Sequence, residues 1–490
     1  MPKRIKFSEY FKINKSQAEL DFVDIPIKGD IPLFIDPFAI HHRKDRLAFD
    51  CHNTIVDFFG RVLRAIQANK KDDALELLSY LREPNQTHLG LSRGSVSRGR
   101  GIGGIQAEEL LNALTRSKAI KTGLLKDLED CALLVDGLGS DKISDITTNL
   151  IRKHLIEYTV DQCRLWSVPC SREVSAGYVW IGGNSGWQPA LAKLPICNEK
   201  VVLLVPKAFV QWRIAFDSYE YYRKDVLEFI QNEHLASSSS LVRLLKSGKR
   251  KGEERPPYKK TLAARMEYKY SKDFLTDFSA KNLTVLDGYR KDKKGSLSEL
   301  SEDDLNVAGA GNLLRNDEDL IAELKKIPVG NKSATDYHRH VFGLLEVVFS
   351  PTLNYPRIEA EIDQGRKRVD IIFTNAGKDG FFSWLNRVRG VPCAYIFIEC
   401  KNYSDDLGNP ELDQLLGRFN ASNGKFGFIM NRKFTDKKLF IQRCRDAALK
   451  GRGHVIAIDD ADLAKLLKCK LKGQSEVEGY LRERFYEIDN

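Results

Sequence analysis

Two acidic residues and a lysine near the carboxyl-terminal end stand out because they interrupt stretches that are otherwise apolar. Asp370 lies in the run GRKRVDIIFTN, and Glu399 lies at the end of AYIFIEC, with Lys401 two positions later. An isolated ionised carboxylate in a buried strand is so costly that it is normally protonated, paired with a cation or bound to a metal ion. The sequence therefore predicts that these three side chains share one polar site.

The alternation of side chains along a strand indicates how the site is built. Residues i and i+2 point to the same face, so Glu399 and Lys401 should lie together, and Asp370 on a neighbouring strand end can meet them. Two hard oxygen ligands and a cation suit the binding of Mg²⁺ and the transition state of phosphodiester hydrolysis. We therefore expect Mg²⁺ as the cofactor, with Mn²⁺ as the alternative.

The elements around these residues alternate between helical and extended patterns. We expect a helix at 335–349, strands at 357–362, around Asp370 and at 394–400, a helix at 410–420, a strand at 425–431, a helix at 436–449 and a last strand at HVIAI. The closing strand–helix–strand units need crossovers, which predicts a mixed sheet flanked by helices.

This order and its acidic residues resemble the PD-(D/E)xK nuclease superfamily, whose restriction-endonuclease-like core runs helix, three strands, helix, strand. The resemblance covers roughly residues 335–468, about a quarter of the chain. It implies that Asp370 is the first metal-binding acid and Glu399 the second. It also implies that Lys401 positions or activates the attacking water, and that Cys400 offers its backbone carbonyl.

Two further positions follow from the same resemblance. Glu346, on the helix before the sheet, matches an extra acid that many members place there, and Gln414 in PELDQLLGRF resembles a glutamine that follows the core in several RecB-like and restriction-type nucleases. Val369 departs from the pattern, since the family has a proline before the first acid. The implied catalytic set is Asp370, Glu399, Lys401 and Gln414, and the implied metal ligands are Glu346, Asp370, Glu399 and Cys400.

Basic residues close to Asp370 are candidates for holding nucleic-acid phosphates. Arg366, Lys367 and Arg368 directly precede the strand that carries this acid. On a strand or hairpin beside the metal they could contact the phosphate backbone. The alternative is that they form an ordinary charged hairpin turn.

A glycine- and arginine-rich stretch at 89–104 contains a formal GxGxxG pattern. No apolar strand precedes it and the Walker lysine is absent, which argues against dinucleotide or P-loop binding. We expect a mobile surface loop there, or a loop that touches phosphates through Arg98 and Arg100.

The chain carries a net charge of +10, and a large share of this excess lies in one stretch. The segment from Arg243 to Lys260 has eight basic and two acidic residues, with Lys249, Arg250 and Lys251 at its centre. It follows SSSS and contains two consecutive prolines, which predicts an exposed loop or linker. It is a second candidate for phosphate contact, and a solvated linker is the alternative.

Length and composition indicate how many domains the chain forms. With 490 residues, 42% of them hydrophobic, the chain should fold into two to four domains, and its nine cysteines include no CxxC pair. A disulfide framework or zinc ribbon is therefore not expected. We expect a largely helical region over 1–235, a basic and helical connector over 236–334, the nuclease-like αβββαβ mixed-sheet core over 335–470 and a final helix over 471–490, an α+β or α/β multidomain protein.

These observations predict a metal-dependent nuclease that acts on DNA, an endonuclease of the kind found in prokaryotic restriction or antiviral defence. The alternatives are a nucleic-acid-binding scaffold whose nuclease-like core has lost turnover, and a nuclease that acts on RNA. Homo-oligomers or partner proteins of a defence system are expected partners. The sequence has no apolar segment long enough to span a bilayer, so we expect a cytoplasmic protein without a membrane partner.

Overall fold

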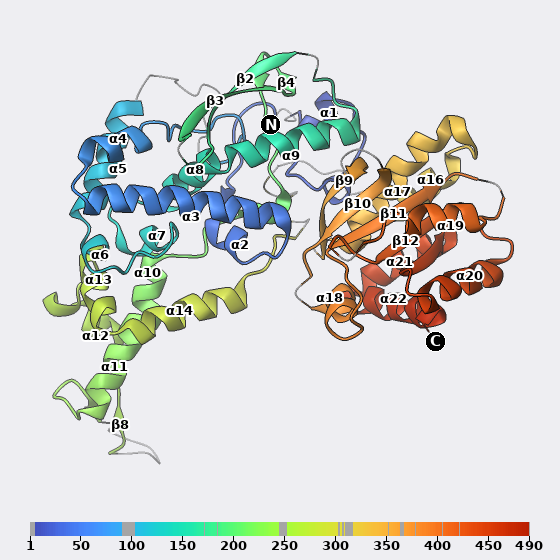
Figure 1. Cartoon of the computed structure of the whole chain (residues 1–490). Coiled ribbons are helices and arrows are strands. Elements are labelled where there is room, and N and C mark those ends of the chain that lie inside the picture. Colours follow the sequence, from blue (N-terminus) through green and yellow to red (C-terminus); the bar gives the residue numbers. More distant parts are fainter. Residues whose placement is uncertain are drawn as a thin grey trace.

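The computed structural model has a helical lobe, formed by the first 300 residues or so, and a sheet-containing lobe formed by the rest of the chain (Figure 1). The residues that it describes are 5–90, 103–170, 172–183, 185–244, 252–301, 304–305, 308, 317–350, 352–362, 367–377, 379–403, 405–420 and 422–489. In these ranges no helix has the length and apolar character needed to cross a membrane.

The longest described helix of the first lobe is α3 (Arg46–Gln67). Asp45 begins it by accepting a hydrogen bond from the Ala48 backbone N–H at 2.8 Å, and the apolar face from Ile55 to Val62 is buried. The helix ends before Asn69, which adopts a left-handed conformation (φ 56°), and a second helix, α4 (Lys71–Leu78), begins two residues later.

Two further helices of this lobe follow one another directly along the chain. α8 (Ser140–Leu150) and α9 (Arg152–Trp166) meet at Ile151, which ends one helix and begins the next. The extended segment between Asp21 and Ile40 contains one two-residue strand, β1. The other elements in this part of the lobe are α1 (Phe7–Tyr10), η1 (Gln17–Glu19), β1 (Phe34–Ile35), α2 (Pro37–His41), α5 (Gly103–Arg116), α6 (Lys118–Lys121) and α7 (Asp130–Leu134).

The hairpin formed by β2 (Glu173–Trp180) and β3 (Trp187–Lys193) was not predicted from the sequence. Many positions of the hairpin are half-exposed, and its register shifts between Ser175 and Gly177. The alternation of apolar and polar residues that is typical of a strand is therefore weak. The elements that follow it are β4 (Ile196–Cys197), β5 (Lys200–Val201), η2 (Lys207–Phe209), β6 (Val210–Gln211), α10 (Ser218–Tyr221), η3 (Tyr222–Val226), α11 (Leu227–Ala236), α12 (Lys259–Ala263), η4 (Met266–Tyr268), α13 (Lys272–Lys281) and α14 (Leu283–Ser296).

The basic stretch from Arg243 to Lys260 lies at the tip of an extension of this lobe (Figure 1). An exposed loop or linker was expected here. Within the described residues of the stretch, β7 (Arg243–Leu244) pairs antiparallel with β8 (Glu254–Arg255), and Lys259 and Lys260 begin α12. Lys249, Arg250 and Lys251 fall outside the described residues, as do Arg98 and Arg100 of the glycine-rich stretch.

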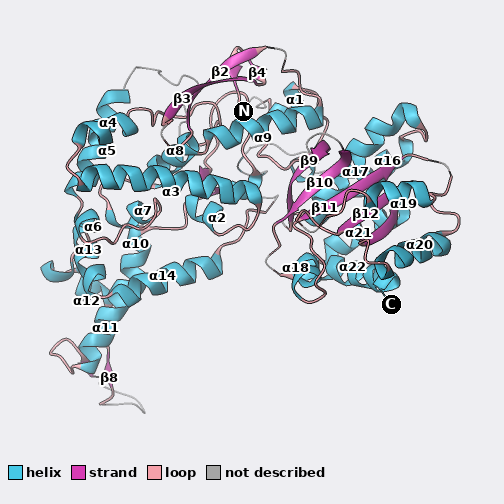
Figure 2. Ribbon diagram, in the orientation of Figure 1, coloured by secondary structure: helices cyan, strands magenta, loops and turns pink. Residues whose placement is uncertain are grey.

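The second lobe contains the mixed sheet that the sequence predicted (Figure 2). Its strand order is β13-β12-β11-β10-β9; the β9, β10 and β11 pairs are antiparallel, and the β11, β12 and β13 pairs are parallel. The strands are β9 (Leu353–Ile362), β10 (Lys367–Asn375), β11 (Tyr395–Lys401), β12 (Phe426–Asn431) and β13 (His454–Asp459). The helices are α16 (Asp317–Lys326), η5 (Asn331–Ser333), α17 (Ala334–Phe349), α18 (Gly380–Arg387), α19 (Asn409–Leu416), α20 (Lys437–Leu449), α21 (Asp460–Lys472) and α22 (Gln474–Asp489).

Helices cover both faces of this sheet, and the two faces differ in what they carry. On one face α17 packs through Phe349, whose ring lies 5.5 Å from Phe428 of β12. On the other face Phe397 of β11 contacts Phe419, just after α19, at 5.7 Å between ring centroids. Phe428 is the register partner of Ile398, the neighbour of Phe397, so the alternation of β11 agrees with both contacts.

The helical lobe covers the side of α17 that faces away from the sheet. η1 packs on this helix at Gly343, where a Cβ atom would lie 3.2 Å from the Glu19 carboxylate and 3.2 Å from the Lys15 ammonium. Glycine permits this close approach. α17 is therefore buried between the sheet and the other lobe, and its apolar pattern serves both contacts.

Candidate active site

Asp370 and Glu399 lie on the same face of the sheet. The antiparallel register pairs Ile371 of β10 with Ile398 of β11, and one step further along this register Asp370 is opposite Glu399. Residues directly opposite each other in neighbouring strands share a face. The Cys400 backbone N–H donates a hydrogen bond of 3.0 Å to Asp370 Oδ2, which holds this carboxylate against the main chain beside Glu399.

Lys401 connects Glu399 to Gln414 through its side chain. Its Nζ donates to Glu399 Oε1 at 2.7 Å and to Gln414 Oε1 at 3.1 Å. Glu399 is fully buried and 13% of the Lys401 side chain is exposed, while Gln414 lies on the exposed side of α19. The structure thus brings together Asp370, Glu399, Lys401 and Gln414, and the site reaches solvent beside α19.

Arg418 is a fourth charged member of this site that the sequence did not indicate. Its Nη1 pairs with Glu399 Oε2, so that the Glu399 carboxylate lies between Arg418 and Lys401. Burial lowers the pKa of the Arg418 guanidinium, and the negative charge of Asp370 opposes that shift. Its spacing of four residues from Gln414 was the available signal, because residues i and i+4 of a helical segment share a face.

The ligand atoms of this site are those that Mg²⁺ prefers. Asp370 and Glu399 supply carboxylate oxygens from adjacent strands, and the main chain at Cys400 runs directly beside Asp370. Hard oxygen donors of this kind suit Mg²⁺ or Mn²⁺. Two carboxylates are balanced here by two cationic side chains, so a divalent ion must compete with Arg418 for Glu399.

Glu346 does not belong to this group, and its prediction as a metal ligand is wrong. It lies on α17, which packs against the opposite face of the sheet from Glu399. Its carboxylate is fully buried and pairs with Lys207 of the helical lobe at 3.1 Å. The sequence placed Glu346 correctly on a helix before the sheet but could not show which side of that helix meets the sheet.

The structure does not describe the side chains of the basic residues expected beside Asp370. Arg366 falls outside the described residues, and for Lys367 and Arg368, at the start of β10, the structure describes the strand but not the side chains. Their contact with phosphate stays a prediction.

A basic cavity between the two lobes opens on the same face of the sheet as Glu399. Its volume is about 720 Å³, and Tyr395, two strand positions before Phe397 and four before Glu399, forms part of its wall. The basic residues that line it are Arg43, Lys44, Arg46 and Arg387. Arg43 and Arg46 are paired with Asp45 and Asp50, which offsets part of the positive charge.

Comparison with known proteins gives partial matches. Residues 12–217, most of the helical lobe, match a protein family described as "Domain of unknown function (DUF8370)". A segment of 133 residues is 30% identical to the putative transposon gamma-delta 80.3 kDa protein of Escherichia coli (strain K12), which corresponds to 27% of this chain and 18% of that protein. The chain thus matches less than a fifth of this relative's length. No solved structure matches the chain.

Proposed function

We propose that the protein is a metal-dependent nuclease that hydrolyses phosphodiester bonds of DNA at a site formed by Asp370, Glu399 and Lys401. The order of the elements supports this assignment: α17, β9, β10, β11, α19 and β12 follow the helix, three-strand, helix, strand sequence of the restriction-endonuclease-like core. The helix α18 is an insertion between the second and third strands. An endonuclease of prokaryotic restriction or antiviral defence is part of the proposal.

The observation that carries the proposal is the placement of these three residues on one face of adjacent strands. Asp370 is held by the Cys400 N–H, and Lys401 is held between Glu399 and Gln414. Strand alternation and the cost of unpaired buried carboxylates explain why the charged groups gather at one site beside the apolar positions of β10 and β11.

The chain's own residues would divide the chemistry as follows. A bound Mg²⁺, held by Asp370, Glu399 and the Cys400 carbonyl, would supply Lewis acidity and lower the pKa of a bound water. Lys401 offers its ammonium protons to the attacking water or to a non-bridging phosphate oxygen, where it offsets the developing negative charge. Gln414 keeps the Lys401 side chain at the solvent-facing edge of the site.

DNA is proposed as the substrate on two grounds. The partial relative is named as a protein of a transposon, which is a mobile segment of DNA. The basic cavity between the lobes, on the same face as Glu399, suits contact with phosphates that extend away from the scissile bond.

One observation favours a second candidate, a nucleic-acid-binding scaffold without turnover. Both oxygens of the Glu399 carboxylate are engaged by cationic side chains, Lys401 on one and Arg418 on the other. A carboxylate neutralised in this way is also what a purely structural ion pair would look like.

Cleavage assays on the full chain separate the two candidates. Plasmid, linear duplex, single-stranded DNA and RNA are incubated with the wild type and with Glu399→Gln and Lys401→Met, in Mg²⁺, in Mn²⁺ and with EDTA. We expect wild-type cleavage of DNA that needs the metal, and a loss of at least about 100-fold in rate for each variant, because each removes transition-state stabilisation of several kcal/mol.

The matched control is Asp413→Asn, which alters an acidic residue on α19 that pairs with Arg452 at the surface. It should cleave like the wild type. If the wild type binds DNA but does not cleave it in either metal, the scaffold is favoured. If it cleaves RNA alone, RNA is the substrate of the same proposed active site.

A further inference from the structure

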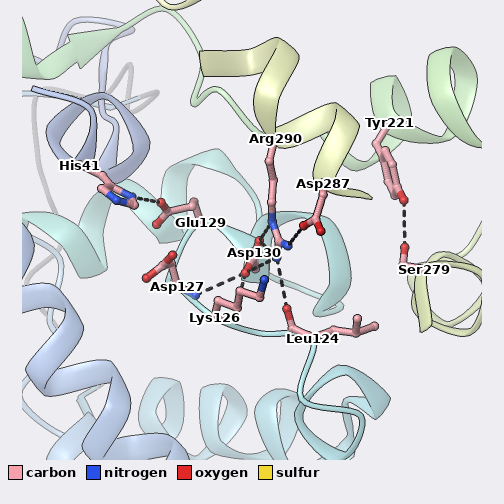
Figure 3. Close-up of polar contacts among 10 residues, drawn as sticks. All are labelled: His41, Leu124, Lys126, Asp127, Glu129, Asp130, Tyr221, Ser279, Asp287 and Arg290. Atoms are coloured by element: carbon pink, nitrogen blue, oxygen red, sulfur yellow. Dashed lines mark hydrogen bonds and ion pairs between the residues drawn. The ribbon is translucent and has the colours of Figure 1, made fainter. Parts of the chain in front are cut away.

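A second group of metal-binding side chains lies in the helical lobe, far from the sheet in sequence and within the region matched by the family of unknown function (Figure 3). It consists of His41 from the last turn of α2, Asp127 from the loop before α7, and Glu129 at the start of α7. One nitrogen or oxygen atom from each of the three lies within 4.8 Å of the other two.

We propose that His41, Asp127 and Glu129 form a binding site for a divalent transition-metal ion, with Zn²⁺ as the ion that suits this ligand set best. An imidazole nitrogen with two carboxylates favours Zn²⁺ over Mg²⁺ or Ca²⁺, which prefer oxygen ligands alone. Three protein ligands would leave a fourth position of the tetrahedron for water or another ligand.

The separation of two of the three ligand atoms agrees with tetrahedral coordination. His41 Nδ1 and Glu129 Oε1 are 3.4 Å apart. Two ligand atoms bound to Zn²⁺ at about 2.0–2.1 Å and at the tetrahedral angle are separated by roughly 3.4 Å. For a direct hydrogen bond the same separation is long, since such contacts between nitrogen and oxygen usually measure about 2.9 Å. Asp127 needs a side-chain rotation to complete the set.

The charge balance of the group differs from that of a simple ion pair. In the part of the chain that the structure describes, neither Asp127 nor Glu129 forms an ion pair with a lysine or arginine, although Lys294 acts electrostatically on His41. Glu129 is only 5% exposed. Two carboxylates next to one imidazole leave negative charge in a mostly buried place, and a divalent cation would offset it.

The neighbouring acid shows how the loop is held in place. Asp130 has its charge balanced by Arg290 of α14, whose Nη2 lies 2.8 Å from both carboxylate oxygens, and it also accepts the backbone N–H groups of Lys126 and Asp127. Figure 3 shows this arrangement beside the facing side chains of His41 and Glu129. Partners of this kind fix the orientation of metal ligands in known sites.

Access to the group is open on the side of His41. The side chain of His41 is 36% exposed, and the ring of His52 from α3 stacks on it at 3.9 Å between centroids. An ion can therefore enter from solvent, and His52 offers a second imidazole next to the first.

The test measures Zn²⁺ binding by the full chain after removal of metal with a chelator, by competition with a chromophoric zinc indicator. We expect one Zn²⁺ that an equal concentration of Mg²⁺ does not displace. His41→Ala and Asp127→Asn should each weaken binding at least about tenfold, because each removes a direct ligand. Both residues are half-exposed, so both variants should fold. Asp136→Asn, an exposed acid in the next loop, is the matched control and should bind Zn²⁺ like the wild type.

Co²⁺ in place of Zn²⁺ gives a second measurement, on the ligand type. The nine free cysteines are the competing ligands, and a site built from His41 and carboxylates should give cobalt bands without a thiolate charge-transfer band. Unchanged Zn²⁺ affinity in both variants would overturn the proposal. The proposal would also be overturned if Asp370→Asn lost the ion while His41→Ala kept it, because the ion would then be bound at the proposed nuclease site. Absence of Zn²⁺ binding by the wild type would overturn it as well.

Discussion

The buried ion pair between Lys207 and Glu346 gives a direct test of how the two lobes are joined. Lys207 belongs to the helical lobe and Glu346 to α17, and their charged atoms are 3.1 Å apart with 6% and 0% of the side chains exposed. Lys207→Met and Glu346→Leu each remove one charge of this buried pair. The double variant removes both charges and keeps the side-chain volumes similar.

The expected magnitudes follow from this burial. Breaking a buried pair by removing one partner costs about 3–5 kcal/mol, whereas replacing both partners by apolar side chains is often neutral or stabilising. We therefore expect each single variant to lose roughly 3–5 kcal/mol of stability and the double variant to recover most of it. Because the pair is almost fully buried, high salt should change these differences little.

The assay combines thermal unfolding with DNA cleavage by the same preparations. Glu346 contacts Lys207 on the side of the sheet away from Asp370 and Glu399, so cleavage should recover in the double variant together with stability. A double variant that is stable but does not cleave DNA would show that Glu346 acts in the reaction. A double variant as unstable as the single ones would show that the two charges are not coupled, and either result would refute the reasoning.

Two further predictions concern single side chains. Burial raises the pKa of Asp36 from its ordinary value of 3.8 to about 7, so the folded chain keeps this proton to higher pH than the unfolded chain and stability falls as the pH rises from about 4 to about 7. Asp36→Asn should remove up to roughly 3 kcal/mol of that fall, measured as the difference in urea unfolding between pH 4.5 and pH 7.5, and an unchanged pH dependence would contradict the prediction. Arg418→Met should lower the Mg²⁺ concentration for half-maximal cleavage by roughly tenfold, since it removes a cation that competes for Glu399. A rise in that concentration would show instead that Arg418 helps to assemble the site.

The strands β11, β12 and β13 could be predicted because they are buried on both faces. In β11 the residues from Ile396 to Cys400 are all buried, which produces a continuous apolar run, and Glu399 is conspicuous only against that background. The same property made the pairing of Asp370 with Glu399 and Lys401 predictable, since alternation fixes the face of each residue. In β2 and β3 the half-exposed positions give no comparable contrast, and the hairpin was missed.

The role of Glu346 could not be predicted, for a physical reason. A helix that is buried by the sheet on one side and by another lobe on the other has apolar residues around most of its circumference, so its periodicity does not show which side faces the sheet. The deciding contacts are those with Lys207 and at Gly343, and both involve residues more than a hundred positions away along the chain. Arg418 was missed because its contact with Glu399 depends on how the chain after α19 packs against the sheet, which the local sequence does not show.

The two acidic groups of this protein differ in how their charge is balanced, and that difference bears on their roles. At the sheet, Lys401 and Arg418 offset the charge of Asp370 and Glu399, so the fold does not depend on a metal ion there and an ion can be exchanged during a catalytic cycle. In the helical lobe, no lysine or arginine among the described residues pairs with Asp127 or Glu129. An ion at that group offsets charge that the chain leaves unbalanced, so its binding energy adds to the stability of the folded lobe. This charge balance would suit an exchangeable ion at the proposed nuclease site and a permanently bound ion at the proposed site in the helical lobe.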